Sequence, residues 1–556
     1  MMRQLLLVPP FVLTAIFILK SIAALRGFNW DIDIDHMMYF GSRIWHGELV
    51  WTKEFDEQMP IIQLVFAIPA LLKSIRTWQF ISLVLIMTAA FFLWMSLKLV
   101  LTTTWGVRKK SADVIALYSS SLFLYLFVLL PGSISHINPL AASLLTIATM
   151  MQFRSSSFSK EKHSIWLDRS SMVAAILTSI SVSIRPYYLF SSILMGIWYA
   201  ARVHAMASLR LLIKDDRPWI KPALIPMLIY TMKWSITIFI FGLIFNAGPF
   251  IVTNNIPSFV SGLRMLSQDL TPDPVVGILL SQIMNLYSSS SLTFVVFIMS
   301  AVWVTLYIAR AVWDQTVRVR LRTHIPSIDI LYVAFLSPLL LELMILRQHY
   351  WTHYLQLFVP YASLTVAFCM GCFLKGNVVG EPPEKHSLSV SFLMAIVVCS
   401  IMLLSISHAG IPGCLIEIFR PSLDYRQNEF FRIKKMADVW RQNGKHFLYP
   451  SSMSAMYIHW KLDESRHGFP DSYITYLILK SSLRNDLVLP ELLAMPSNKD
   501  EYCRKLITQG PTVVIDTNSR LISSCFEQKE DNQYVMTDEI ICGKRGKKIF
   551  IYERRQ

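Results

Sequence analysis

The stretch WQFISLVLIMTAAFFLWMSLKLVL, residues 78–101, decides the fold class. It is apolar almost throughout and contains a single charged residue, Lys98. A helix needs about 20 such residues to cross the hydrocarbon core of a bilayer, because each residue advances it by about 1.5 Å. Segments of this kind recur along the chain, so the sequence predicts a polytopic α-helical membrane protein.

The overall composition agrees with this class. The chain has 556 residues, of which 54% are hydrophobic and 16% are charged, and its mean hydropathy is +0.45. Soluble domains carry roughly 25% charged residues, so a soluble globule is excluded. The net charge of +15 would suit nucleic acid, but basic clusters such as 108–110 and 318–322 lie in short loops between apolar segments. That is the positive-inside pattern of membrane proteins, and no nucleic-acid partner is expected.

We expect about eleven transmembrane helices. With the N-terminus in the cytoplasm, the loops assigned to the inside contain most of the lysines and arginines, and the C-terminus lies outside. The first apolar run is interpreted as a retained span, not a cleaved signal peptide. The short stretch 60–72 is expected to form an interfacial or re-entrant helix. The expected spans are residues 5–24, 78–101, 114–130, 135–151, 171–184, 187–201, 222–246, 290–309, 328–345, 355–374 and 387–407.

The chain beyond the last span has a different pattern of polar and apolar residues. Residues 427–442 have helical periodicity, 511–516 form an apolar run typical of a buried strand, and 534–553 suggest two strands joined by a turn. We therefore expect a membrane domain at 1–407, with a first outer loop at 25–77, and an extracytoplasmic mixed α/β domain at 408–556. An outer location would permit disulfides among the tail cysteines, without fixing their pairing. These are Cys414, Cys503, Cys525 and Cys542.

The first outer loop gathers acids beside the membrane, in the stretch DIDIDHMMYFGSRIWHGELVWTKEFDEQMP at residues 31–60. In an extended segment Asp31, Asp33 and Asp35 would share one face. If a helix begins near Asp35, that residue is a candidate N-cap, one turn from Tyr39. Desolvation and like-charge neighbours make a carboxylate a better proton acceptor, which suits a general base. A solvated acidic loop is the alternative.

Two further outer segments supply cations. The loop RQHYWTHY, which begins at Arg347, contains His349, His353 and Tyr354 between two expected spans. Arg and His are hydrogen-bond donors that suit a phosphate, while an aromatic belt with incidental histidines is the alternative. Arg185 lies between two apolar runs and needs an anionic partner, either a lipid headgroup or a substrate phosphate.

Together these groups favour a reaction in which a lipid-phosphate donor delivers a group outside the cytoplasm. The sequence has no nucleotide-binding motif on the cytoplasmic side, so the energy would come with the donor. For sugar transfer, a carboxylate would deprotonate the acceptor hydroxyl while Arg and His stabilise the departing phosphate.

Three short motifs resemble the GT-C superfamily of integral-membrane glycosyltransferases, in the branch that contains protein O-mannosyltransferases and lipid A aminoarabinose transferases. The first is Asp35-His-Met-Met-Tyr39 followed by glycines, the second is Phe55-Asp-Glu-Gln-Met-Pro60, and the third is His353-Tyr354 before Pro360. The chain departs from the family pattern in two places: His36 replaces an acid, and a single proline ends the second motif. These departures leave open which aspartate is the base.

The resemblance implies a polyprenyl-phosphate sugar donor, inversion at the anomeric carbon, and a glycan, lipid or protein acceptor at the plasma (inner) membrane. By the motif match Asp35 is the expected base and Asp33 the second choice, as base or as metal or acceptor ligand. Tyr39, Glu54, Asp56 and Glu57 would support the acceptor. No cofactor is certain; a divalent Mg or Mn at Asp31, Asp33 and Asp35 stays open, because only some superfamily members need one.

Two other classes remain as alternatives. A polyprenyl-linked polysaccharide polymerase or ligase usually places its Arg and His residues in a large late outer loop. Here the outer loop at 247–289 has one basic residue, Arg264, which disfavours that class. A non-catalytic flippase or transporter would be expected to show repeats and several charges inside the membrane. The sequence shows no repeat, and Lys233 is the main mid-span charge.

Overall fold

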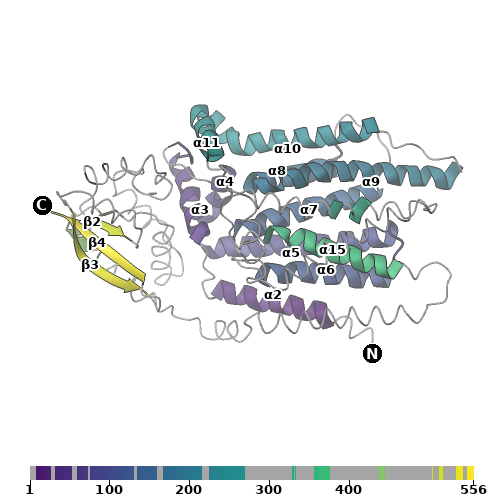
Figure 1. The fold of residues 1–556 in the computed structure, drawn as a ribbon, viewed down its shortest axis with the longest axis horizontal. Helices are drawn as coiled ribbons and strands as arrows, with labels where there is room; N and C mark the ends of the chain where they lie inside the picture. The colour runs from purple at the N-terminus through teal and green to yellow at the C-terminus, as the bar shows by residue number, and fades with distance from the viewer. Residues whose placement is uncertain are drawn as a thin grey trace, which may run out of the picture. The chain divides into compact units, whose positions relative to one another are not determined.

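A computed structural model gives the fold (Figure 1). The structure describes residues 8–26, 32–52, 59–72, 75–129, 134, 136–158, 167–215, 224–268, 328–330, 332–333 and 356–375. In the tail it describes residues 436, 439–440, 442–443, 447–448, 504, 507, 513–516, 534–542 and 547–555.

The described part of the chain is mostly helical, as expected. Of its helices, four are long and apolar enough to cross a membrane: Val8–Leu25, Thr77–Thr103, Lys109–Leu129 and Ile225–Val252. Helices also occupy the other expected spans between residues 135 and 201 and near 355–374. The expected spans at 290–309 and 387–407, and most of 328–345, lie outside the described residues, so the number of about eleven stays a prediction. The long helices are α2 (Val8–Arg26), α5 (Ile75–Thr103), α6 (Lys109–Leu129), α7 (Ile137–Phe158), α8 (Arg169–Ile184), α9 (Leu189–Asp215), α10 (Leu224–Val252) and α15 (Val359–Lys375).

The chain divides into two compact units. Unit 1 comprises Met1–Asn29, Ile81–Phe245 and Ser267–Phe419, and unit 2 comprises Trp30–Phe80, Asn246–Leu266 and Arg420–Gln556. Each unit is described by itself below. The predicted domains, 1–407 and 408–556, stay predictions.

In unit 1 the helices run side by side as a bundle (Figure 1). Helices α8 and α9 form a hairpin that packs on α7. The Ser181 hydroxyl donates to the carbonyl of Ala141, near the start of α7, at 2.8 Å. At the other end of α7, the Ser155 hydroxyl donates to a carboxylate oxygen of Asp168 at 3.0 Å, so α8 runs antiparallel to α7. Small and hydroxyl side chains allow this close approach of membrane helices.

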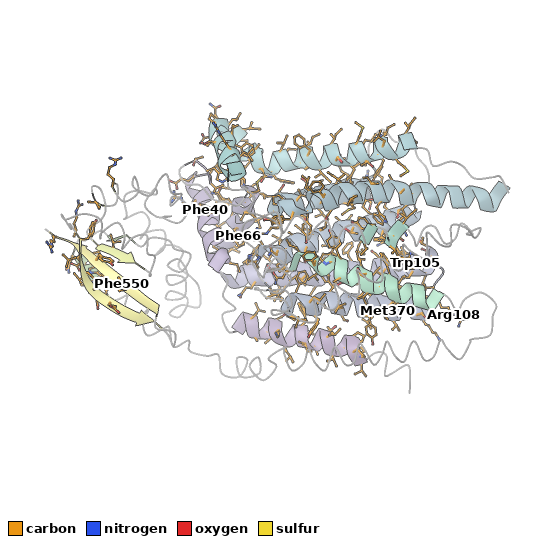
Figure 2. All side chains as sticks on the ribbon, in the orientation of Figure 1. Phe40, Phe66, Trp105, Arg108, Met370 and Phe550 are labelled. Carbon is orange, nitrogen blue, oxygen red and sulfur yellow. The ribbon has the colours of Figure 1, made fainter. Side chains whose placement is uncertain are left out.

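A buried ion pair lies near the far end of α7. The Arg202 Nε of α9 donates to Asp329 at 2.9 Å, and neither side chain is exposed to solvent. The indole N–H groups of Trp105 and Trp198 donate to the same carboxylate at 2.9 and 3.0 Å. Charges inside an apolar bundle are costly unless paired and hydrogen-bonded, and this carboxylate is both. Figure 2 labels Trp105 near Arg108 and Met370 at the same end of the bundle.

In unit 2 the acidic stretch forms a helix, α3 (Ile32–Arg43), followed by the short 3-10 helix η1 (Ile44–His46). The extended alternative is therefore wrong for these residues, and the helix begins three residues before Asp35, so Asp35 is not its N-cap. The reason is that the buried residues of this stretch repeat with the period of a helix, which is longer than that of a strand. Ile34, Met37, Met38 and Gly41 are buried at the i, i+3, i+4, i+7 spacing of a helix face, and this pattern outweighs a short Asp–Ile alternation.

Two more short helices belong to unit 2, α4 (Ile61–Leu71) and α11 (Ile256–Gln268). Helix α4 confirms the helix expected at 60–72. It is too short to cross a bilayer, and it exposes Ile68, Leu71 and the following Leu72, as an interfacial helix would.

The described tail contains a four-stranded sheet with strand order β1-β2-β4-β3. Strands β1 (Phe447–Leu448) and β2 (Val513–Asp516) are parallel, and β3 (Tyr534–Cys542) and β4 (Lys547–Arg554) form an antiparallel pair. The strands expected at 511–516 and 534–553 are confirmed. Most of the helix expected at 427–442 lies outside the described residues. So do three of the tail cysteines, Cys414, Cys503 and Cys525.

Candidate active site

The position of the acidic helix α3 depends on a glycine. A Cβ atom at Gly41 would lie only 2.5 Å from the backbone carbon and oxygen of Phe66 in α4. Real Cβ contacts are not this close, so any larger residue would push the two helices apart. Figure 2 shows Phe40 and Phe66 at this contact. Helix α3 is thus held against α4 at van der Waals distance.

A buried amide fixes the C-terminal end of α3. The Nε2 of Gln63, in α4, donates to the carbonyls of Phe40 and Glu48 at 2.9 and 2.8 Å. Its Oε1 accepts from the backbone N–H of Val50 at 2.9 Å. These bonds satisfy backbone groups that the helix end leaves without partners inside the helix. Helix α3 and the turn after it therefore form one body with α4.

The first turns of α3 contain the two aspartates predicted as base. Positions 33 and 35 are about 200° apart around the helix axis, because each residue turns an α-helix by about 100°. They flank the buried stripe on opposite sides, so Asp33 and Asp35 do not share the face that an extended segment would have given them. Positions 35 and 39 lie one turn apart on the same flank, as the helical interpretation expected. Asp31, Glu54, Asp56 and Glu57 lie outside the described residues.

The turn after α3 shows groups that sequence reasoning missed. Arg43, itself buried, forms an ion pair with Glu48, and Gly47 adopts a left-handed conformation with φ of 72°. The indole N–H of Trp45 donates to the carbonyl of Ala67 in α4 at 2.7 Å. The glycine spacing after Tyr39 indicated a turn, but nothing in the sequence pairs Arg43 with Glu48.

Arg185 lies in unit 1 at the tip of the α8–α9 hairpin. Its backbone is extended, with φ of −134° and ψ of 95°, the conformation that a following proline favours. The side chain is only 3% exposed, and its Nε donates to Oδ1 of Asn138. The backbone N–H of Asn138 donates to Nδ1 of His136 at 3.1 Å, so His136 caps the start of α7. The sequence analysis did not identify His136 or Asn138.

A second contact joins the hairpin tip to the residues just before α15. The Tyr188 hydroxyl, next to the hairpin tip, donates to the carbonyl of Leu357 at 2.8 Å. Leu357 follows Tyr354 by three residues and lies two residues before the start of α15. The Arg185 hairpin therefore contacts the residues that lead into α15. The predicted phosphate-binding residues of the loop itself lie outside the described residues: Arg347, His349, His353 and Tyr354.

Among the described residues, no group of three or more His, Cys, Asp or Glu side chains could hold a metal ion. The candidate set of Asp31, Asp33 and Asp35 includes a residue outside that part of the chain. Binding of a metal by the first outer loop therefore stays a prediction.

The solved structures similar to this chain include an oligosaccharyltransferase. No family model matches the chain, and no curated protein matches it. The crystal structure of the Archaeoglobus fulgidus oligosaccharyltransferase, in complex with Zn and sulfate, matches 99% of this chain and 73% of its own, with 10% identity and a TM-score of 0.40. At that identity and TM-score the likeness assigns no family. The resemblance to the O-mannosyltransferase branch stays a prediction.

Proposed function

We propose that this protein is a membrane glycosyltransferase that moves a sugar from a polyprenyl-phosphate donor to a hydroxyl acceptor on the extracytoplasmic face. The observation that carries the proposal is the contact between Tyr188 and Leu357. It joins the Arg185 hairpin to Leu357, which follows Tyr354 by three residues in the chain. Sequence reasoning selected the hairpin and the His353–Tyr354 loop separately as phosphate-binding, and this contact supports the proposal that the two segments serve one anion site.

In the proposed reaction, Asp35 accepts the proton of the acceptor hydroxyl. The acceptor oxygen attacks the anomeric carbon as the bond from that carbon to the phosphate oxygen breaks, so a single displacement inverts the anomeric configuration. Arg185 stabilises the charge that develops on the departing phosphate, with the loop cations Arg347, His349 and His353. Each of these roles follows from the charge and donor groups of the side chain.

Asp35 is preferred over Asp33 because of its neighbour on the helix. Position 39, one turn along the same flank of α3, is a tyrosine whose hydroxyl could hydrogen-bond the acceptor. Position 33 lies on the opposite flank and has no such neighbour one turn further along, where the helix places Met37. Glu54, Asp56 and Glu57 would orient the acceptor from the segment before α4.

The proposed topology rests on the distribution of basic residues. It places the N-terminus in the cytoplasm and both the first loop and the tail sheet outside the plasma membrane. The acceptor would then be an envelope glycan, a lipid or a protein.

The test uses purified full-length protein in lipid nanodiscs, a panel of radiolabelled polyprenyl-phosphate sugars and a membrane extract as acceptor. Wild type is compared with Asp35→Asn and Asp33→Asn. The matched control is Asp113→Asn, because Asp113 forms a partly exposed ion pair with Lys98 outside the proposed site. Thermal unfolding of each variant establishes that it is folded.

We expect transfer by wild type and the control, loss of about 100-fold or more in Asp35→Asn, and a smaller loss in Asp33→Asn. Full activity in Asp35→Asn would overturn its assignment as base. If no donor supports transfer and labelled lipid moves across liposome membranes, the protein is a flippase and the proposed glycosyltransferase function is wrong.

A further inference from the structure

The end of α10 presents an exposed apolar surface. Helix α10 is a candidate membrane span at Ile225–Val252, and little of it is buried inside the protein. At its last turn Ile251 and Val252 are exposed, Val252 to 87%. An apolar surface of this kind on a spanning helix faces lipid.

The chain then turns at a fixed corner into α11 (Figure 1). Asn254 adopts a left-handed conformation with φ of 54°. The backbone N–H of Asn255 donates to the carbonyl of Phe250 at 2.7 Å, and that of Ser258 donates to the carbonyl of Asn255 at 3.1 Å. These bonds close the end of α10 and start α11 four residues later. Helix α11 therefore begins directly after the candidate membrane span ends.

Helix α11 has an amphipathic surface. Ile256, Val260 and Leu263 are exposed, Val260 to 57%, and their i, i+4, i+7 spacing places them in one stripe. Its 13 residues include no acid, and Arg264, which is exposed, borders the stripe. At about 20 Å the helix is too short to cross a bilayer.

The other side of α11 is fastened to the turn after α3. The ring of Trp51 lies 5.8 Å from that of Phe259 and 6.4 Å from that of Phe250. A Cβ atom at Gly262 would lie 2.3 Å from the Trp51 ring, so the indole packs directly on the helix backbone. The lipid-facing stripe is thus distinct from the surface that α11 uses inside unit 2.

We propose that α11 lies along the membrane surface and contacts the boundary between lipid headgroups and acyl chains through Ile256, Val260 and Leu263. Arg264 then lies at headgroup depth, where a cation meets lipid phosphate. Lipid is chosen over a protein partner because the stripe begins only four residues after the exposed apolar end of α10, which is a candidate membrane span. The inference is independent of the proposed glycosyltransferase activity.

The test measures where individual α11 positions lie in the bilayer. An environment-sensitive fluorescent amino acid is placed by amber suppression at Val260 in the full chain, in nanodiscs. The matched control is position 261, which is exposed and about 100° around the helix from 260. Phe239, exposed within the α10 span, gives the reference for the membrane interior. Quenchers are aqueous iodide and lipids with bromine atoms near the headgroup end of the acyl chains.

We expect emission at 260 at shorter wavelength than at 261, strong quenching by brominated lipid at 260, and strong quenching by iodide at 261. Equal iodide quenching at 260 and 261 would overturn the proposal, because the stripe would then face water. Blue-shifted emission at 260 with quenching by neither agent would also overturn it, since protein would then cover the stripe. Short-wavelength emission at 239 that iodide does not quench shows that the bilayer is intact in each sample.

Discussion

The Nε of Arg185 donates to Oδ1 of Asn138, which joins the tip of the α8–α9 hairpin to the first turn of α7. Both side chains are buried. A neutral amide partner fixes the plane of the guanidinium without cancelling its charge. Asn138 is therefore a positioning residue for the cation that we propose meets the donor phosphate.

The first prediction concerns this amide. Asn138→Leu removes the acceptor and should lower the free energy of unfolding by about 1–3 kcal/mol, because the buried guanidinium loses this hydrogen bond. Asn138→Asp keeps an acceptor and supplies a countercharge, so it should retain stability but raise the KM for the polyprenyl-phosphate donor. Thermal unfolding and transfer kinetics measure the two effects. Equal donor KM in wild type and Asn138→Asp would contradict the positioning role.

The second prediction concerns Gly41, whose added Cβ would overlap the backbone of Phe66. Gly41→Ala should lower the free energy of unfolding by about 1–3 kcal/mol, as overpacking does, and should reduce activity by shifting α3. Gly248→Ala is the matched control, since an added Cβ there meets nothing within 4 Å and alanine favours a helix. Scanning calorimetry in nanodiscs compares the two variants, and similar midpoints would refute the close-contact explanation.

The third prediction concerns the buried ion pair of Arg202 and Asp329. Arg202→Met leaves a buried carboxylate without its cation and should lower the free energy of unfolding by about 3–5 kcal/mol. The double variant Arg202→Met/Asp329→Leu should be less destabilised than Arg202→Met alone, because it leaves no unpaired charge. Thermal unfolding of wild type, Arg202→Met, Asp329→Leu and the double variant gives the coupling energy. If the loss of stability in the double variant equals the sum of the losses in the two single variants, the pair does not act as a unit.

The fourth prediction concerns Tyr534 in the tail sheet. Burial raises the pKa of the Tyr534 phenol from 10.0 to about 12, partly opposed by the nearby Arg554 cation. The folded sheet thus holds this proton more tightly than the unfolded chain does. Its contribution to stability is complete below pH 10 and is lost as pH rises through 12.

The tyrosinate absorbance of wild type minus that of Tyr534→Phe, followed as pH rises, tests this prediction. The difference in absorbance, which reports the Tyr534 phenol, should have its midpoint near pH 12. The sheet of the variant should lose less stability than that of wild type between pH 10 and 12. A difference spectrum with a midpoint near pH 10 would mean that Tyr534 is not buried in solution.

Several features of the site were beyond sequence reasoning, for different physical reasons. The Asp–Ile alternation at 31–35 has strand periodicity, and only packing of Met37, Met38 and Gly41 against α4 shows that helical periodicity decides the structure. Arg202 and Asp329 are separated by more than a hundred residues in the chain, so no local pattern joins them. His136 and Asn138 become notable only because the hairpin returns Arg185 to the start of α7.

The sequence by itself determined the membrane class, the long helices between residues 8 and 252, and the strands at 513–516 and 534–554. These depend on local hydrophobicity and periodicity, which the order of residues contains. Only the tertiary structure decided that α3 starts before Asp35, that Asp33 and Asp35 flank opposite sides of its buried stripe, and that Arg185 and the start of α15 meet at one end of unit 1. Those relationships depend on contacts between segments distant in the chain, whose energies no single stretch of sequence contains.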